Sequence, residues 1–183
     1  MTTVVSRQRW VVDTMAIGQN DRVLEVGCGR GTVAAMISQQ LASGRITAID
    51  RSATMARLTR ERLAGFIEAG TADVRRDAIE TVDLPAASFD KIFAVNLSLF
   101  WIGDISAGIE RVKQLLTPEG RLYVFGERPS AAEATAIGQN AEALLQAHGF
   151  TTVRASATGR GGRGRVCVSA STSNAVLDRT IRR

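Results

Sequence analysis

Residues 23–31 read VLEVGCGRG, and the order of apolar residues and glycines in this stretch decides the fold. The run from Arg22 to Val26 is short and mostly apolar, which predicts a buried strand. Glycines follow at once, and residues 32–42 then carry apolar side chains at helical spacing. A glycine turn between a strand and a helix lets backbone approach a ligand, and the helix start offers unpaired N–H groups. The stretch therefore predicts a ligand-binding turn at the edge of a sheet.

The residue types around this turn indicate the charge of the ligand. Gly27, Gly29 and Gly31 are spaced G-x-G-x-G, and Thr32 stands where a dinucleotide-binding turn has its third glycine. Glu25 lies in the strand just before the turn. A carboxylate there would repel a pyrophosphate, whereas it suits the amino group of a cationic ligand. Both features favour S-adenosylmethionine over NAD.

The rest of the chain alternates between strand-like and helical segments, which predicts a parallel sheet with helices on both faces. A leading helix is expected over Thr3 to Ala16. The helix from Ala53 to Leu63 is expected to begin after Ser52 and to stop at Gly65. Further strands are expected over 45–49, 72–76, 89–95 and 121–125, and further helices over 105–116 and 131–147. The final segments, 150–156 and 165–171, read as a hairpin joined by the loop TGRGGRG.

Polar side chains follow three further strands at the points where those strands end. Asp50 lies 19 residues after Gly31, at the end of the second strand. A carboxylate there can accept hydrogen bonds from both hydroxyls of a ribose. Asp77 follows the third strand and Asn96 follows the fourth. Together with Glu25 they form the arrangement expected for a crevice at the carboxyl edge of an open α/β sheet.

Length and composition indicate one globular domain. The chain has 183 residues, of which 45% are hydrophobic and 22% are charged. No apolar run approaches the ~20 residues of a membrane helix, and the first ten residues do not resemble a signal peptide. We therefore expect a cytoplasmic protein. The two cysteines, Cys28 and Cys167, lack the spacing of a metal site or disulfide, and no metal is expected.

The net charge of +5 permits an anionic partner. The arginines are scattered, however, and no basic stripe with interleaved aromatic residues supports nucleic-acid binding. The GRGGRGR run, residues 159–165, is read as a hairpin tip rather than as an RNA-binding segment. A small-molecule partner is favoured over nucleic acid, no membrane partner is expected, and the sequence leaves the oligomeric state open, a homodimer included.

Five segments resemble the class I S-adenosylmethionine-dependent methyltransferases, in particular the small-molecule, type 11/12-like branch. They are VLEVGCGRG (23–31), ITAIDRSATM (46–55), RRDAIETVDLP (75–85), SFDKIFAVNLSLFW (88–101) and LLTPEGRLYVFGE (115–127). The resemblance covers about residues 20 to 171. It implies a doubly wound, Rossmann-like seven-stranded sheet of order 3-2-1-4-5-7-6 whose last strand is antiparallel. It also implies one methyltransferase domain over residues 1–171, followed by a polar tail over 172–183.

The same resemblance implies which residues bind S-adenosylmethionine and its product S-adenosylhomocysteine. Glu25 and the turn around Cys28 would hold the methionine part, Asp50 the ribose, and Asn96 would lie near the sulfonium. The remaining implied contacts are the backbone of Gly27, Gly29 and Gly31, Arg51 or Met55 beside the adenine, and Asp77 and Ala78 at the adenine edge. The segment NLSLFW lacks the paired prolines of the members that methylate nucleic-acid amines, which argues against a base amine as the acceptor.

The catalytic residue stays open at this point. Asp104, Glu127 and Asn96 are candidate bases by position, but Asp104 is better explained as a helix cap and Glu127 as part of a turn. Phe100 and Trp101 would either shape an acceptor pocket or pack beneath the next helix. His148, the single histidine, is best explained by its place at a helix end.

Three alternative functions share this fold prediction. One is an NAD-dependent oxidoreductase, against which Glu25 and Thr32 argue. The second is a methyltransferase-like protein that binds the cofactor without transferring the methyl group, since no base is assigned. The third is an RNA- or ribosome-modifying methyltransferase, which the positive charge permits.

Overall fold

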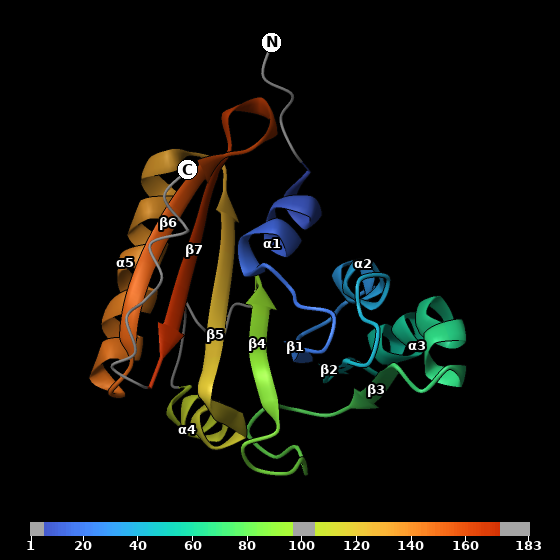
Figure 1. The fold of residues 1–183 in the computed structure, drawn as a ribbon. Helices are drawn as coiled ribbons and strands as arrows, with labels where there is room; N and C mark the ends of the chain where they lie inside the picture. Colours follow the sequence, from blue (N-terminus) through green and yellow to red (C-terminus); the bar gives the residue numbers. More distant parts are fainter. Residues whose placement is uncertain (1–5, 97–104, 173–183) are drawn as a thin grey trace.

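The structure is a computed structural model that describes residues 6–96 and 105–172. Seven strands form one sheet of order β3-β2-β1-β4-β5-β7-β6 (Figure 1). Strands β1 to β5 pair in parallel, and β7 runs antiparallel to both β5 and β6. The strands are β1 Arg22–Val26, β2 Arg45–Asp50, β3 Ala72–Arg76, β4 Phe89–Val95, β5 Leu116–Arg128, β6 Thr151–Thr158 and β7 Gly164–Ser171. The expected fold class and strand order are confirmed.

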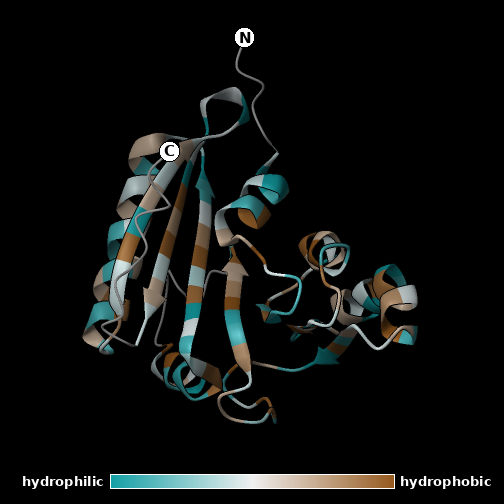
Figure 2. Ribbon diagram, viewed as in Figure 1, coloured by the Kyte–Doolittle hydropathy of each residue, from teal (hydrophilic) through white to brown (hydrophobic). Residues whose placement is uncertain are grey.

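Helices cover both faces of this sheet because the buried strands carry apolar side chains on both sides. The helices are α1 Arg7–Met15, α2 Thr32–Ser38, α3 Ala53–Glu68, α4 Ser106–Leu115 and α5 Ala131–Ala147. Helices α1, α2 and α3 share one buried apolar cluster with the sheet, and α4 and α5 share the other. Figure 2 shows the apolar residues concentrated along the central strands, with polar residues on the outer surfaces of the helices.

Alternation along β1 decides which face Glu25 occupies. Val23 packs in the cluster of α1, α2 and α3, while Leu24 packs in the cluster of α4 and α5. Because successive side chains of a strand point to opposite faces, Glu25 lies on the same face as Val23. Its carboxylate is therefore buried beneath the side of the sheet that α1 and α2 cover.

Helix α1 is held firmly against the carboxyl half of the sheet. Val11, Val12 and Met15 are buried, and the Trp10 ring meets the Phe125 ring edge-on with 5.3 Å between centroids. Ser6 caps the helix by accepting a hydrogen bond from the Arg9 N–H at 3.2 Å. Figure 1 shows α1 beside the carboxyl ends of β4 and β5.

Several expected boundaries are wrong. Helix α3 continues past Gly65 to Glu68, because that glycine faces open space and an exposed helical glycine costs only about 1 kcal/mol. The left-handed Gly70, with φ +75°, follows its end. Helix α2 ends at Ser38, whereas the sequence predicted a helix to residue 42. Strand β5 begins at Leu116, whereas the sequence predicted its start at Arg121.

The terminal hairpin has the expected form. Strands β6 and β7 pair antiparallel from Thr151 opposite Ser171 to Thr158 opposite Gly164. A short 3-10 turn over Arg160–Gly162 forms the tip. None of the helices in the described ranges has the length and hydropathy that a membrane span requires.

Candidate binding site at the carboxyl edge of the sheet

The glycine turn after β1 is anchored to the neighbouring strand by backbone bonds. The N–H groups of Gly27 and Cys28 both donate to the carbonyl of Ile49, at 2.9 and 3.0 Å. The Gly29 N–H donates to Oδ2 of Asp50 at 2.9 Å. These bonds draw the turn over the end of β2 and place Asp50 beside it.

Gly31 shows why this turn needs glycine. Its φ is +69°, and a Cβ there would lie 2.7 Å from Cγ2 of Thr59 on α3. Thr59 in turn donates through Oγ1 to the Gly29 carbonyl at 2.9 Å. The turn is thus fixed between two strands and α3, and it can present the same backbone surface to a ligand each time.

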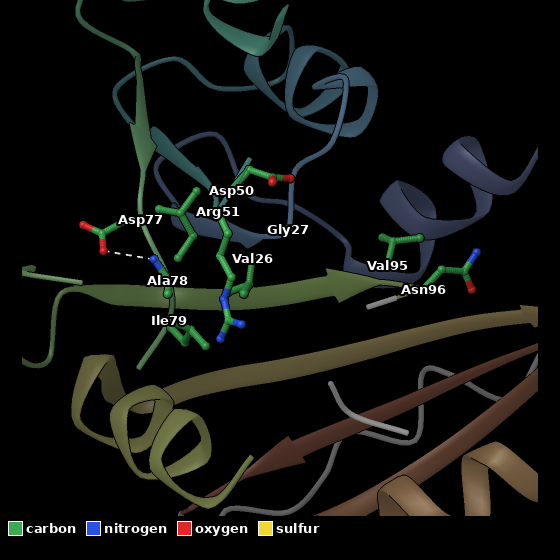
Figure 3. A pocket seen from close by; sticks show the side chains of 10 residues that line it. Val26, Gly27, Asp50, Arg51, Asp77, Ala78, Ile79, Val95 and Asn96 are labelled. Atoms are coloured by element: carbon green, nitrogen blue, oxygen red, sulfur yellow. Dashed lines mark hydrogen bonds between the residues drawn. The ribbon is translucent and has the colours of Figure 1, made fainter. Parts of the chain in front are cut away.

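Two hollows adjoin at this turn. The first, about 200 Å³, opens over the ends of β2, β3 and β4 (Figure 3) and is lined by Val26, Gly27, Ile49, Asp50, Arg51, Asp77, Ala78, Ile79, Val95 and Asn96. The second, about 320 Å³, lies beneath α1 and α2 and is lined by Arg7, Gln8, Glu25, Gly27, Cys28, Gly29, Arg30, Thr32, Val33 and Val95. Gly27 and Val95 belong to both, so the hollows adjoin at these residues, and we refer to the two together as the crevice.

In the first hollow, Asp50 has both oxygens engaged by backbone and still has accepting capacity. Oδ1 accepts from the Ser52 N–H at 2.9 Å, and Oδ2 accepts from Gly29. A carboxylate offers about four acceptor positions, so each oxygen can take one more donor. A pair of vicinal hydroxyls matches that remaining capacity.

At the far end of the first hollow lie Arg51, which forms an ion pair, and the turn at Asp77. Arg51 pairs with Glu80, which lies beyond β3, and Figure 3 shows the Arg51 side chain extended across the hollow. Oδ1 of Asp77 accepts the Ala78 N–H at 2.9 Å. A flat aromatic group would find apolar walls here, from Ile49 and Ile79, with polar groups at its edge.

Asn96 closes the first hollow on the β4 side in a strained backbone conformation. Its φ is +52°, which asparagine tolerates better than most residues. Its N–H donates to the Phe125 carbonyl, and its Oδ1 accepts the Glu127 N–H at 2.8 Å. The amide oxygen is thus oriented by β5, and Asn96 is not assigned as the base because a side-chain amide is too weakly basic to take a proton near neutral pH.

Glu25 dominates the second hollow. Its side chain is 3% exposed, and Oε2 has no hydrogen-bond partner in the described part of the chain. Burial raises the pKa of Glu25 to about 8; the Ala34 backbone N–H lowers it in part, and the charge of Asp50 raises it further. A buried carboxyl oxygen without a hydrogen-bond partner, such as Oε2, is costly. A cation in this hollow would relieve that cost.

The other candidate groups near the turn do not serve as nucleophile or base. Burial raises the pKa of Cys28 to about 12, although its hydrogen bond with Thr59 lowers it in part. Glu127 accepts from Arg163 at 3.1 Å and from Arg165 at 2.7 Å. Burial raises the pKa of Glu127, but these two arginines more than offset it and leave a lowered pKa.

The structure gathers most of the predicted binding residues but not all of them. Gly31 and Met55 line neither hollow. His148 also lies outside them; its Nδ1 is 3.1 Å from Oε1 of Glu110, a structural contact between α5 and α4. Asp104, Phe100 and Trp101 lie outside the described residues. Among the residues that are described, no group of three or more His, Cys, Asp and Glu side chains could hold a metal ion.

Sequence reasoning missed one side of the second hollow. Arg7 and Gln8 come from α1, Arg30 lies within the glycine turn and Val33 follows it closely. Arg30 and Val33 could have been included because of their place in or beside the motif. Nothing in the motif points to α1, because its place in the site depends on how the helix packs against β5.

Comparison with known proteins places this geometry in context. Residues 23–120, more than half of the chain, match the methyltransferase domain family. The uncharacterized methyltransferase YdaC of Bacillus subtilis (strain 168) is 27% identical over 150 residues, which cover 79% of this chain and 80% of YdaC. A trans-aconitate 2-methyltransferase of Paracidovorax citrulli is 33% identical over 104 residues, but these are 56% of this chain and 37% of that relative.

Among solved structures, the chain is similar to a SAM-dependent methyltransferase from Aquifex aeolicus. The TM-score is 0.69 at 18% identity, over 90% of this chain and 89% of the other. At that identity the similarity concerns the fold, which agrees with the observed strand order.

Proposed function

Because the chain belongs to the methyltransferase domain family, we propose that it transfers a methyl group from S-adenosylmethionine to a small-molecule O, N, S or C nucleophile. The observation that carries the proposal is Glu25. It places a buried carboxyl group, whose Oε2 has no hydrogen-bond partner among the described residues, beside a glycine turn, at the end of a crevice whose other half holds Asp50. That combination suits a ligand with a cationic end and a nucleoside end.

The first hollow fits the nucleoside. Asp50 would accept the ribose hydroxyls with its remaining lone pairs. Ile79 and the stem of Arg51 would pack beside the adenine, with Asp77 and Ala78 at its polar edge. These assignments rest on the lining of the hollow and the hydrogen bonds that position each group.

The second hollow argues against a dinucleotide. A pyrophosphate on this turn would lie next to the buried Glu25 and would be repelled by its ionised form. The ammonium of an amino acid would instead neutralise Glu25 and supply the missing partner of Oε2. Glu25 and the Gly27 and Gly29 backbone would thus hold the methionine end.

When bound, S-adenosylmethionine supplies an electrophilic methyl group on a positively charged sulfur. The chain's own residues then need to bind, align and exclude water, because alignment alone can supply on the order of 7–11 kcal/mol in favourable systems. Asn96 and Glu127 are both engaged in other bonds, so no described side chain is assigned as the base. We propose that catalysis here rests on positioning.

We also assign residues 1–171 to one methyltransferase domain, with 172–183 as a tail outside it. All seven strands belong to a single sheet, and both terminal strands of that sheet are packed by helices, which supports one folding unit. The acceptor is proposed to be a small molecule because the trans-aconitate relative is named for one.

Methyl transfer is tested by supplying S-adenosylmethionine with a labelled methyl group and following the label. The protein is incubated with a metabolite extract, and separately with structured RNA. We expect label in the small-molecule fraction and formation of S-adenosylhomocysteine. Label confined to RNA would replace the small-molecule acceptor, and cofactor binding without transfer to either would reduce the protein to a binding role.

A further inference from the structure

The second hollow is lined by an acidic and a basic side chain that each have one buried polar atom left without a hydrogen bond among the described residues. Oε2 of Glu25 and Nε of Arg7 are both buried, and neither makes a hydrogen bond in the described part of the chain. Glu25 comes from β1 and Arg7 is the first residue of α1. Both side chains line the same hollow.

The two groups also do not pair with each other. Arg7 and Glu25 form no ion pair, although other arginines of the chain, such as Arg51 and Arg165, do bind carboxylates. Two oppositely charged side chains in one hollow would ordinarily form an ion pair, since each unpaired buried group is costly. The separation leaves room for a ligand that carries both charges itself.

Arg7 belongs to a helix that is packed and capped. Three side chains of α1 are buried, Trp10 packs on Phe125, and Ser6 caps the helix. Arg7 also acts electrostatically on the β5 end, where its charge helps lower the pKa of Glu127. The guanidinium therefore occupies a defined place between the hollow and β5.

We propose that Arg7 binds the carboxylate of the cofactor's amino-acid end while Glu25 receives its ammonium, so that α1 forms one wall of the cofactor site. This inference rests on the proposed function and adds a residue and an element to it. A guanidinium can donate to both oxygens of a carboxylate in a planar fork. The hollow would then select an intact α-amino acid end, with each charge met by its opposite.

The experiment compares ligands that differ in that end. Calorimetric titration measures binding of S-adenosylmethionine, of its decarboxylated form, which keeps the amine and lacks the carboxylate, and of methylthioadenosine, which lacks both. We expect the wild-type protein to prefer the intact ligand over the decarboxylated one by roughly 10- to 100-fold, as for hydrogen bonds between charged groups. Arg7→Gln should remove most of this preference, with little change for methylthioadenosine.

Two variants control the result. Arg9→Gln removes a charge from the same helix, but Arg9 is exposed and pairs with Asp13, so its ligand preferences should match the wild type. Arg7→Lys keeps the charge without the fork and should retain part of the preference. The far-ultraviolet circular dichroism of each variant checks that α1 and the rest of the fold are intact.

The possible results distinguish a failure of the role proposed for Arg7 from a failure of the proposed function. If the folded Arg7→Gln protein keeps the full preference for the carboxylate, or loses affinity equally for all three ligands, the role of Arg7 is overturned while cofactor binding stands. If the wild-type protein binds none of the three, the proposed function itself fails.

Discussion

Single residues in the glycine turn have a structural role beside the binding role proposed for the turn, and Gly31 shows the structural one most clearly. Replacing Gly31 with alanine would force a side chain into the left-handed region and bring a Cβ to 2.7 Å from Thr59. We expect the free energy of unfolding to fall by about 1–3 kcal/mol. Urea denaturation of the variant and the wild type measures this difference.

Gly65→Ala provides the matched control. Gly65 lies inside α3 with no atom within 4 Å of an added Cβ. Alanine has the higher helix propensity and restricts the unfolded chain, so this variant should gain about 0.4–1 kcal/mol. Equal effects of the two substitutions would contradict the account of the turn.

Glu25 predicts an unusual dependence of stability on pH. Its pKa is about 8 in the folded protein against 4.5 for an exposed carboxyl, so the folded state binds this proton more tightly than the unfolded state. The stabilisation is complete below about pH 4.5 and is lost as the pH rises towards 8, at up to about 1.4 kcal/mol per unit. The measurement is the free energy of unfolding of the wild type and Glu25→Gln across this range.

The difference between the two proteins isolates this one group. Glu25→Gln keeps the size of the side chain and removes the titrating proton, so its stability should fall less steeply between pH 5 and 8. Parallel curves for the two proteins would show that Glu25 is not the buried acid described here.

Among the helices, α5 is the one whose bounds the sequence predicted best. Ser130 accepts from the Glu133 N–H at 3.2 Å, and the Glu133 carboxylate accepts the Ser130 N–H at 3.0 Å, which completes a capping box. Ser130→Ala should therefore lower the free energy of unfolding by about 1 kcal/mol. Ser130→Asp, which restores an acceptor at the cap, should recover most of the loss in the same thermal or urea unfolding experiment.

The contrast between α5 and α3 shows what local sequence can determine. Helix α5 ends before the left-handed Gly149, as expected, because a glycine there closes the helix. Gly65 sits within α3 instead, because Phe66 and Ile67, which follow it, pack against the apolar cluster and continue the helix. A glycine alone does not tell a stop from a tolerated interruption.

The residues that line the two hollows divide in the same way. The positions of Glu25, Asp50 and Asn96 there were predictable because each stands at the end of a strand that the local pattern identifies. Arg7 was not, because it reaches the site only through the packing of α1 against Phe125 and its neighbours, which are more than a hundred positions away in the chain. Long-range contacts decide which distant element completes a crevice.

At the scale of the whole molecule, four strands end at one edge of the sheet, and α1 packs beside that edge. The crevice that results has a nucleoside-sized hollow with Asp50 and a charged hollow with Glu25. Binding of an adenosyl compound with an amino-acid end in the crevice is the claim on which the proposed methyl transfer depends.

Calorimetric titration with S-adenosylhomocysteine tests that claim most directly. The wild-type protein should bind one molecule per chain. Asp50→Asn should weaken binding roughly 10- to 100-fold through loss of charged hydrogen bonds to the ribose, while Asp83→Asn, an exposed carboxylate outside both hollows, should leave it unchanged. A wild-type protein that binds neither this compound nor S-adenosylmethionine, or an Asp50→Asn variant with undiminished affinity, would contradict the account.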